Sequence, residues 1–373
     1  MFLVYLVNRY GVNLPFSDQW AFVDFIRRSR ASGLPISDYF SQHGEQRMAF
    51  PRMIMMALAR LTKWNIRAEL FVNLMLAAAI FTVLVLLVLR TLKGAPAPAL
   101  AAIPALSVMV FSVVQWEDWF WGWQISWFLP LLAMVFAVGV LCLWPDGRAG
   151  WPAVVMGGAA AAVGQFSLLS ATMIWVVCIP VILLRKGLRN YLWLWVPVGI
   201  ISTAVYLNGY ATPRAFEGHH VPVSVLWERP HDAAAYILYL LGRPVLDERP
   251  RYLAGVLLLA AFTGLAAYVV SFRREALARA APWLSIGAYA AGGSVLTMLG
   301  RMGLGLQFAG SSRYTTLGIL LVVASLGLAT VVLVENGRAW IVAFLWAGAA
   351  FLFVADTPSE LELTRAWHNE KVM

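Results

Sequence analysis

Long apolar runs separated by short polar segments make up most of this 373-residue chain. A helix needs about 20 predominantly apolar residues to cross a bilayer, and these runs are close to that length. The pattern therefore predicts membrane-spanning helices at Glu69–Leu89, Ala97–Val114, Ile125–Trp144, Tyr191–Asn208, Tyr252–Phe272, Pro282–Gly300, Tyr314–Val334 and Ala339–Ala355.

Two further stretches extend this pattern less regularly. Trp151–Leu184 is long enough for two short helices with a break near Gly164–Ser167, and Met1–Phe16 resembles a short first span. Together these predict an all-α, polytopic bundle of about eleven spans, forming a single transmembrane domain over residues 1–373. Two long polar segments, 17–67 and 209–251, are expected to lie outside the membrane on one side.

Met48–Asn65 differs from the other apolar segments because Arg52, Arg60 and Lys63 interrupt it. A charge at the bilayer centre costs about 2.5–3.5 kcal/mol on insertion scales. We therefore expect this segment to lie in the membrane interface rather than to cross it.

Composition agrees with a membrane protein and excludes several classes of partner. The chain is 61% hydrophobic and only 13% charged, against about 25% charged in an ordinary soluble domain. Its 17 Trp suit membrane interfaces. The net charge of +9 suits anionic lipid headgroups or a phosphorylated ligand. The basic residues are scattered, which argues against nucleic acid. Cys142 and Cys178 lie in apolar runs and offer no metal spacing.

Charged residues in the short loops predict the orientation. Arg90, Arg148, Arg185, Arg274 and Arg338 all lie in or beside short loops that alternate onto one side, and the positive-inside rule makes that side cytoplasmic. The opposite, outer side then holds 16 of the 19 acidic residues and all five His. Candidate chemistry is therefore confined to the outer segments.

The first outer segment contains two candidate carboxylates. Asp18 precedes an amphipathic run, so it is either a helix N-cap or a catalytic base near the membrane. Glu45 and Arg47 stand in the dense polar run Gln42–Arg47, where they form either a surface ion pair or part of a site.

Later outer segments add aromatic and basic candidates. Trp116 to Gln124 is either an interfacial belt or a sugar-binding surface, in which indoles stack on sugar rings and Glu117 and Asp118 accept hydroxyl hydrogen bonds. Arg313, beside Tyr314, either snorkels or holds a phosphate. The adjacent His219 and His220 are weak candidates for metal ligands.

Several functional classes lack their motifs. The chain has no HExxH, P-loop, GxSxG, dinucleotide-binding or haem-attachment pattern. Its predicted spans carry almost no ionisable residues at mid-depth, which argues against an ion-coupled transporter.

The remaining motifs resemble a known family. Ser-Asp-Gln-Trp (17–20), Gln-His-Gly-Glu-Gln-Arg (42–47), Phe-Pro-Arg (50–52), Trp-Gly-Trp-Gln (121–124) and Ser-Arg-Tyr (312–314) look like an uncharacterised bacterial group within the GT-C superfamily of polytopic glycosyltransferases. The resemblance implies a GT-C-like fold, a polyprenyl-phosphate-linked sugar donor, and activity at the non-cytoplasmic face of the bacterial cytoplasmic (inner) membrane.

The resemblance also implies roles for single residues. Asp18 would be the catalytic carboxylate, with Glu45 or Asp118 as a second acid, because Gln19 stands where characterised members often have a paired acid. Whether a divalent metal takes part stays open. The substrate would be held by Arg47, Trp116, Glu117, Asp118, Gln124, Arg301, Arg313 and Tyr314.

Three functions remain open on the sequence alone, so it does not decide whether the protein is an enzyme. The first is a glycosyltransferase that uses a lipid-linked sugar within the membrane. The second is a non-catalytic GT-C-like subunit that acts as a scaffold for partner membrane proteins. The third is a flippase or polymerase of lipid-linked saccharides.

Overall fold

The computed structural model describes residues 2–31, 33–211, 218–244 and 250–372. Parts of the second long polar segment, 212–217 and 245–249, therefore lie outside the described residues. Within the described chain almost all regular structure is helical, and a two-stranded antiparallel hairpin pairs Gln42 with Arg47 and His43 with Gln46.

Seven helical segments are long and apolar enough to cross a membrane, judged by length and composition. They confirm an all-α membrane bundle. Their bounds are Ile66–Thr91, Ala99–Phe120, Gly122–Leu143, Arg189–Leu207, Arg251–Phe272, Ser312–Glu335 and Ala339–Val372.

These segments contain the long helices of the bundle. Asn65 caps the first of them, since its side chain accepts a hydrogen bond from the Arg67 amide at 3.0 Å. The helices are α5 (Ile66–Thr91), α6 (Ala99–Val110), α7 (Trp116–Phe120), α8 (Ile125–Leu143), α12 (Leu192–Leu207), α15 (Arg251–Phe272), α17 (Thr315–Glu335), α18 (Ala339–Ala355) and α19 (Thr357–Val372).

The other predicted spans are present as shorter or less apolar helices. The break predicted near Gly164–Ser167 is confirmed, because one helix ends at Gln165 and the next begins after a 3₁₀ turn at Leu169–Thr172. The helices concerned are α1 (Phe2–Tyr10), α9 (Trp151–Gln165), α10 (Met173–Val177), α11 (Ile179–Leu184) and α16 (Leu277–Arg301).

Short elements gather at one end of the bundle. α4 (Ala49–Thr62) has 14 residues, about 21 Å at 1.5 Å per residue, which is too short to cross the roughly 30 Å apolar core. Other short elements at this end include η1 (Ser17–Ala21), α2 (Phe22–Ala31), α3 (Ile36–Tyr39), β1 (Gln42–His43), β2 (Gln46–Arg47), α13 (Val225–Glu228), α14 (Pro230–Gly242) and η10 (Ser312–Tyr314).

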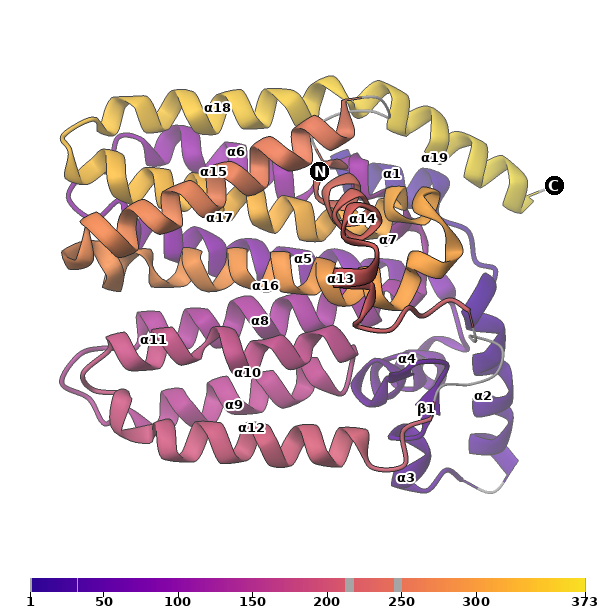
Figure 1. Cartoon of the computed structure of the whole chain (residues 1–373). Coiled ribbons are helices and arrows are strands. Elements are labelled where there is room, and N and C mark those ends of the chain that lie inside the picture. Colours follow the sequence, from indigo (N-terminus) through magenta and orange to yellow (C-terminus); the bar gives the residue numbers. More distant parts are fainter. Residues whose placement is uncertain (1, 32, 212–217, 245–249, 373) are drawn as a thin grey trace.

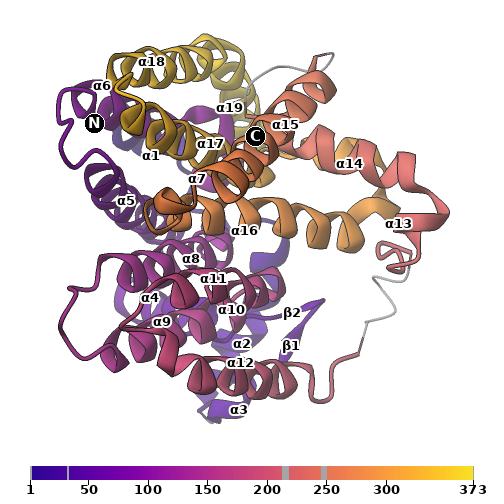
Figure 2. The ribbon, with the colours of Figure 1, turned by 60° about the vertical axis from the view of Figure 1, so that its left-hand side comes forward.

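The long helices form two groups. Figure 1 shows α8 to α12 stacked as one group and α15, α17 and α18 as another, with the short loops at the left end and the short helices α2 to α4 at the right end. Figure 2 shows α16 running between the groups, where it packs on α8, α10 and α11 on one side and on α17 on the other.

Several tryptophans lie inside the bundle rather than at its interface. Trp119, Trp195, Trp283 and Trp346 are fully buried. Each indole N–H donates a hydrogen bond, to Ser112 O, Trp175 O, Thr91 Oγ1 and Thr330 Oγ1 respectively. A buried indole is acceptable only with such a partner, so the high Trp content serves helix packing as well as the interface.

Candidate functional site

A polar pocket of about 360 Å³ opens at the end of the bundle that carries the short helices. Its walls come from segments far apart in the sequence: the turn of the β-hairpin, α8, the loop after the break at Gln165, the segment before α13, the end of α16, and η10. The pocket therefore joins both helix groups at one end of the molecule.

Glu45 provides the buried negative charge of this pocket. It stands in the hairpin turn after Gly44, whose φ of 54° lies in the left-handed region that glycine adopts readily. The Glu45 side chain is 4% exposed and its Oε1 pairs with the Arg301 guanidinium. The same oxygen lies 3.3 Å from Nε2 of His220. Glu45 is thus fixed by two groups that are positive or can become positive.

The Tyr314 side chain interacts with two arginines, Arg301 and Arg313. The centre of its ring lies 5.2 Å from the Arg313 guanidinium carbon, and its side chain also interacts with Arg301. Its ring packs against that of Trp127 at a centroid distance of 5.5 Å. The pocket therefore brings Glu45, Arg301 and Tyr314 together, although they come from the hairpin, the end of α16 and η10. Arg313 does not line the pocket but lies against the Tyr314 ring.

Glu117 joins α7 to η10. Its Oε2 accepts a hydrogen bond from the Arg313 backbone N–H at 3.0 Å, and its own N–H donates to Ser312 Oγ at 2.9 Å. This reciprocal pair holds Arg313 beside the pocket, so Glu117 acts on the site by positioning a neighbour.

Asp118 is fully buried behind this contact. Neither of its carboxylate oxygens has a hydrogen-bond partner among the described residues. The Asn73 side chain instead donates to the backbone carbonyl of Asp118 at 3.0 Å. Asp118 therefore faces the interior and does not line the pocket.

Asp18 lies on the exposed surface at the start of η1 and makes no hydrogen bond or ion pair within the described chain. Its charge acts on His43, whose pKa is lowered by burial and then by Arg52, while Asp18 opposes both effects. Asp18 is the predicted site residue with the freest carboxylate.

Aromatic rings lead from Asp18 toward the arginines. Phe16 packs edge-on against Trp121 at a centroid distance of 5.4 Å, and the Arg313 guanidinium lies 5.7 Å from the Trp121 ring. The His43 ring lies 5.0 Å from that of Trp123. Neither Asp18 nor any of these rings lines the pocket.

Three predicted site residues lie elsewhere. The Arg47 guanidinium donates to the backbone carbonyls of Tyr206, Phe40 and Asn208 at 2.7, 2.9 and 2.5 Å, which fixes the end of α12. Trp116 packs 6.3 Å from the Trp367 ring of α19, and Gln124 is buried at the start of α8. None of them lines the pocket.

Two features of the site carried little signal in the sequence. Trp127 lies within an apolar run, and Glu69 stands at the head of a span, where its buried carboxylate accepts a hydrogen bond from Gln19 at 2.7 Å. The only signal in the sequence for a polar role of Glu69 is its position in the first turn of α5, directly after the Asn65 cap. Within the described residues no group of three or more His, Cys, Asp or Glu side chains is arranged to hold a metal.

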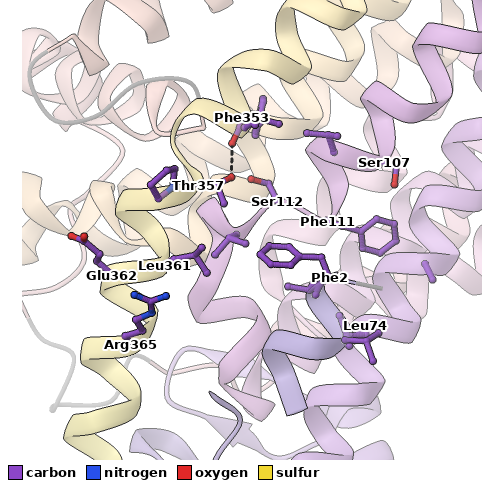
Figure 3. Close-up of a pocket in the computed structure, with 17 residues that line it drawn as sticks. Phe2, Leu74, Ser107, Phe111, Ser112, Phe353, Thr357, Leu361, Glu362 and Arg365 are labelled. Atoms are coloured by element: carbon purple, nitrogen blue, oxygen red, sulfur yellow. Dashed lines mark hydrogen bonds between the residues drawn. The ribbon is translucent and has the colours of Figure 1, made fainter. Parts of the chain in front are cut away.

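A second, largely apolar cavity shares no lining residue with the pocket. This groove of about 990 Å³ is formed by α1, α5, α6, α18 and α19, and Figure 3 shows Phe2, Leu74, Phe111 and Phe353 on its walls. Ser112, Thr357, Glu362 and Arg365 add polar and charged groups to its lining, and the Thr357 hydroxyl donates to the Phe353 carbonyl at 3.1 Å. The groove offers a surface suited to a hydrocarbon chain.

Comparison with known proteins adds no relative: no family model, no curated protein and no solved structure matches this chain.

Proposed function

We propose that this protein is a GT-C-like membrane glycosyltransferase of eleven spans that uses a polyprenyl-phosphate-linked sugar at the outer face. The observation that carries the proposal is the pocket itself: Arg301 and Tyr314 line it, and the Arg313 guanidinium lies against the Tyr314 ring. A separate, largely apolar groove lies elsewhere in the chain. Two cations, aromatic rings and a hydrocarbon surface match the three parts of such a donor: phosphate, sugar and tail.

In the proposed reaction the acceptor hydroxyl attacks the anomeric carbon of the donor sugar. The new bond joins the acceptor oxygen to that carbon, and the bond between the carbon and the phosphate oxygen breaks with its electron pair leaving on the phosphate. The hydroxyl proton passes to Asp18, whose exposed carboxylate has no competing partner. Arg301 and Arg313 offset the negative charge that grows on the departing phosphate.

Glu45 takes a supporting role in this scheme. Its carboxylate is buried against Arg301 and His220, so it is poorly placed to accept a proton from the acceptor. It fixes the direction of the Arg301 guanidinium instead, because an ion pair with a buried carboxylate restricts that long side chain.

The groove accounts for the lipid part of the donor. Ser112 lines the groove, and Glu117, five residues further on, holds the backbone of Arg313 beside the pocket. In the proposed complex a lipid tail lies in the groove and its phosphate is directed toward Arg313.

One observation favours a second candidate function, that of a non-catalytic scaffold subunit. Glu45 and Arg47, the most polar part of the first outer segment, are both used in contacts within the protein. In a scaffold these contacts would stabilise the outer face for binding a partner membrane protein, and Asp18 would have no chemical role.

Transfer measured in proteoliposomes separates the two functions. The donors are undecaprenyl phosphates carrying glucose, mannose, arabinose or N-acetylglucosamine, and lipid extracts and polysaccharide fragments serve as acceptors. We expect Asp18→Asn to lower the transfer rate at least about 100-fold, the usual contribution of a general base. The matched control is Asp24→Asn on α2, whose carboxylate is exposed and already paired with Arg27 and Arg28.

The variants must also remain folded, which thermal unfolding in detergent checks. Transfer by the wild type that survives Asp18→Asn unchanged would contradict the assignment of the base. No transfer by the wild type with any donor of the panel would favour the scaffold.

A further inference from the structure

A second charged cavity lies at the opposite end of the bundle from the polar pocket. It measures about 400 Å³ and is formed by the end of α5, the loop between α8 and α9, the loop between α11 and α12, and the start of α16. In Figure 1 these loops lie at the left, at the end away from α2 and α4. The positive-inside pattern of the sequence makes this the cytoplasmic end.

The walls of this cavity carry an excess of positive charge. Arg90, Arg148, Arg185 and Lys186 line it, against a single carboxylate, that of Asp146. Four like charges around one small space repel each other, and the repulsion is stronger near a membrane than in bulk water. An anion in the cavity would remove this repulsion.

One of the four cations already has partners. The Arg185 guanidinium donates to the backbone carbonyls of Leu141 and Trp144 at 3.0 and 2.7 Å, and it pairs with Asp146. Arg185 thus binds backbone carbonyls at the end of α8 and offsets the negative charge of Asp146.

The other three cations remain available. Arg90, Arg148 and Lys186 make no side-chain hydrogen bond or ion pair anywhere in the described chain. Arg90 is only partly exposed at the end of α5, so its guanidinium is not fully hydrated. The cavity therefore presents about three unmatched positive charges, arranged around the space between two loops.

The neighbouring residues place the cavity at the level of lipid headgroups. Leu183 and Leu184 beside it are exposed, as is Trp151 at the start of α9, and Trp144 lines the cavity. Exposed Leu faces hydrocarbon, while Trp prefers the boundary between hydrocarbon and water. A ligand here would have its charge among the loops and its apolar part along α11.

We propose that this basic cavity binds the phosphates of an anionic glycerophospholipid, with cardiolipin as the preferred species. Two phosphodiester groups on one headgroup offset more of the three free cations than the single phosphate of phosphatidylglycerol does. Basic pockets between transmembrane helices on the cytoplasmic side are suited to such headgroups. This site is independent of sugar transfer, which takes place at the other end.

Native mass spectrometry with the purified protein in detergent tests the proposal. The probes are tetraoleoyl cardiolipin, dioleoyl phosphatidylglycerol and dioleoyl phosphatidylcholine, each titrated separately. We expect one cardiolipin to bind at lower concentration than either other lipid. Each of Arg90→Gln, Arg148→Gln and Lys186→Gln should weaken cardiolipin binding about five-fold, from about 1 kcal/mol for one basic residue near the membrane surface.

A matched control comes from the same end of the bundle. Arg274 is exposed and does not line the cavity, so Arg274→Gln should change cardiolipin binding less than two-fold. Arg148 and Lys186 lie on exposed loops, so their variants report on binding even if Arg90→Gln fails to fold.

Three results would overturn the proposal. The first is equal binding of all three lipids. The second is a loss with Arg274→Gln as large as with the cavity variants. The third is displacement of cardiolipin by millimolar inorganic phosphate, which would identify a soluble anion rather than a lipid as the ligand.

Discussion

Gly122 shows how a single residue decides the packing between η1 and α5. A methyl group at this position would overlap the Glu69 carboxylate and lie 2.9 Å from Nε2 of Gln19. Those two side chains are hydrogen-bonded to each other at 2.7 Å and buried. Because residue 122 has no side chain, the hydrogen bond between Gln19 and Glu69 can form, and this bond attaches η1 to α5.

Substitution of Gly122 tests this packing. Gly122→Ala should lower the free energy of unfolding by about 1–3 kcal/mol, because a well-packed region must shift to accept the methyl group. Gly264→Ala on α15 is the control: its added methyl meets nothing within 4 Å, so helix propensity should raise stability by up to about 1 kcal/mol. Unfolding in mixed micelles measures both. The same sign for both variants would contradict the packing described.

Predictions from the sequence succeeded for some single residues and failed to distinguish others. Arg301, Arg313 and Tyr314 were singled out as charged and aromatic residues of the predicted outer segments. Arg301 and Tyr314 do line one pocket, and Arg313 lies against the Tyr314 ring. Arg47 and Gln124 look equally polar in the sequence. Only the fold shows that one binds the carbonyls at the end of α12 and the other is buried, because both contacts join segments distant in the chain.

The hairpin formed by β1 and β2 depends on one side chain for its attachment to α12. The Arg47 guanidinium binds three backbone carbonyls, and the Arg47 N–H donates to the Tyr206 hydroxyl at 3.0 Å. The carbonyls at the end of a helix have no partner within the helix, so this arginine satisfies them and sets where Glu45 enters the pocket.

A substitution at Arg47 separates support of the hairpin from substrate binding. Arg47→Met should lower the free energy of unfolding by roughly 2–4 kcal/mol, since hydrogen bonds from a charged group are lost at a partly buried site. The control Arg60→Met on α4 removes one exposed contact, to Ser29, and should cost less than about 1 kcal/mol. A raised KM for donor with unchanged stability would instead assign Arg47 to the substrate.

The sequence pattern did not predict the polar C-terminal helix α19. Its apolar contacts are few but specific: Trp367 packs on Phe16, Trp116 and Phe120. A charged segment with one aromatic residue, Trp367, gives no clear helical period, so this helix was not predicted. The apolar spans could, because their length alone is informative.

The whole molecule places its short loops at one end and its long polar segments at the other. This arrangement was predictable from the alternation of charged loops along the sequence. An error of a few residues at one helix boundary does not change the side on which a loop lies. The number of spans was harder to predict, since α9, α10 and α11 are short and α16 is rich in Ala, Gly and Ser. Their place in the bundle comes from packing rather than from apolar length.

Cysteine labelling tests this orientation. Asp24 and Arg274 are exposed at opposite ends, while the native Cys142 and Cys178 are buried and should not react. In intact cells a membrane-impermeant maleimide should label Asp24→Cys at once, and Arg274→Cys only after permeabilisation. Labelling of both from the same side would contradict the proposed topology.

We propose that one donor molecule occupies both the polar pocket and the apolar groove. A cryo-electron microscopy structure of Asp18→Asn with undecaprenyl phosphate-linked sugar tests it most directly, because this variant should bind donor without turnover. We predict donor phosphate oxygens about 2.7–2.9 Å from guanidinium nitrogens of Arg301 or Arg313, with sugar beside Tyr314 and the tail in the groove shown in Figure 3. A phosphate bound away from both arginines, or an empty pocket at saturating donor, would contradict the account.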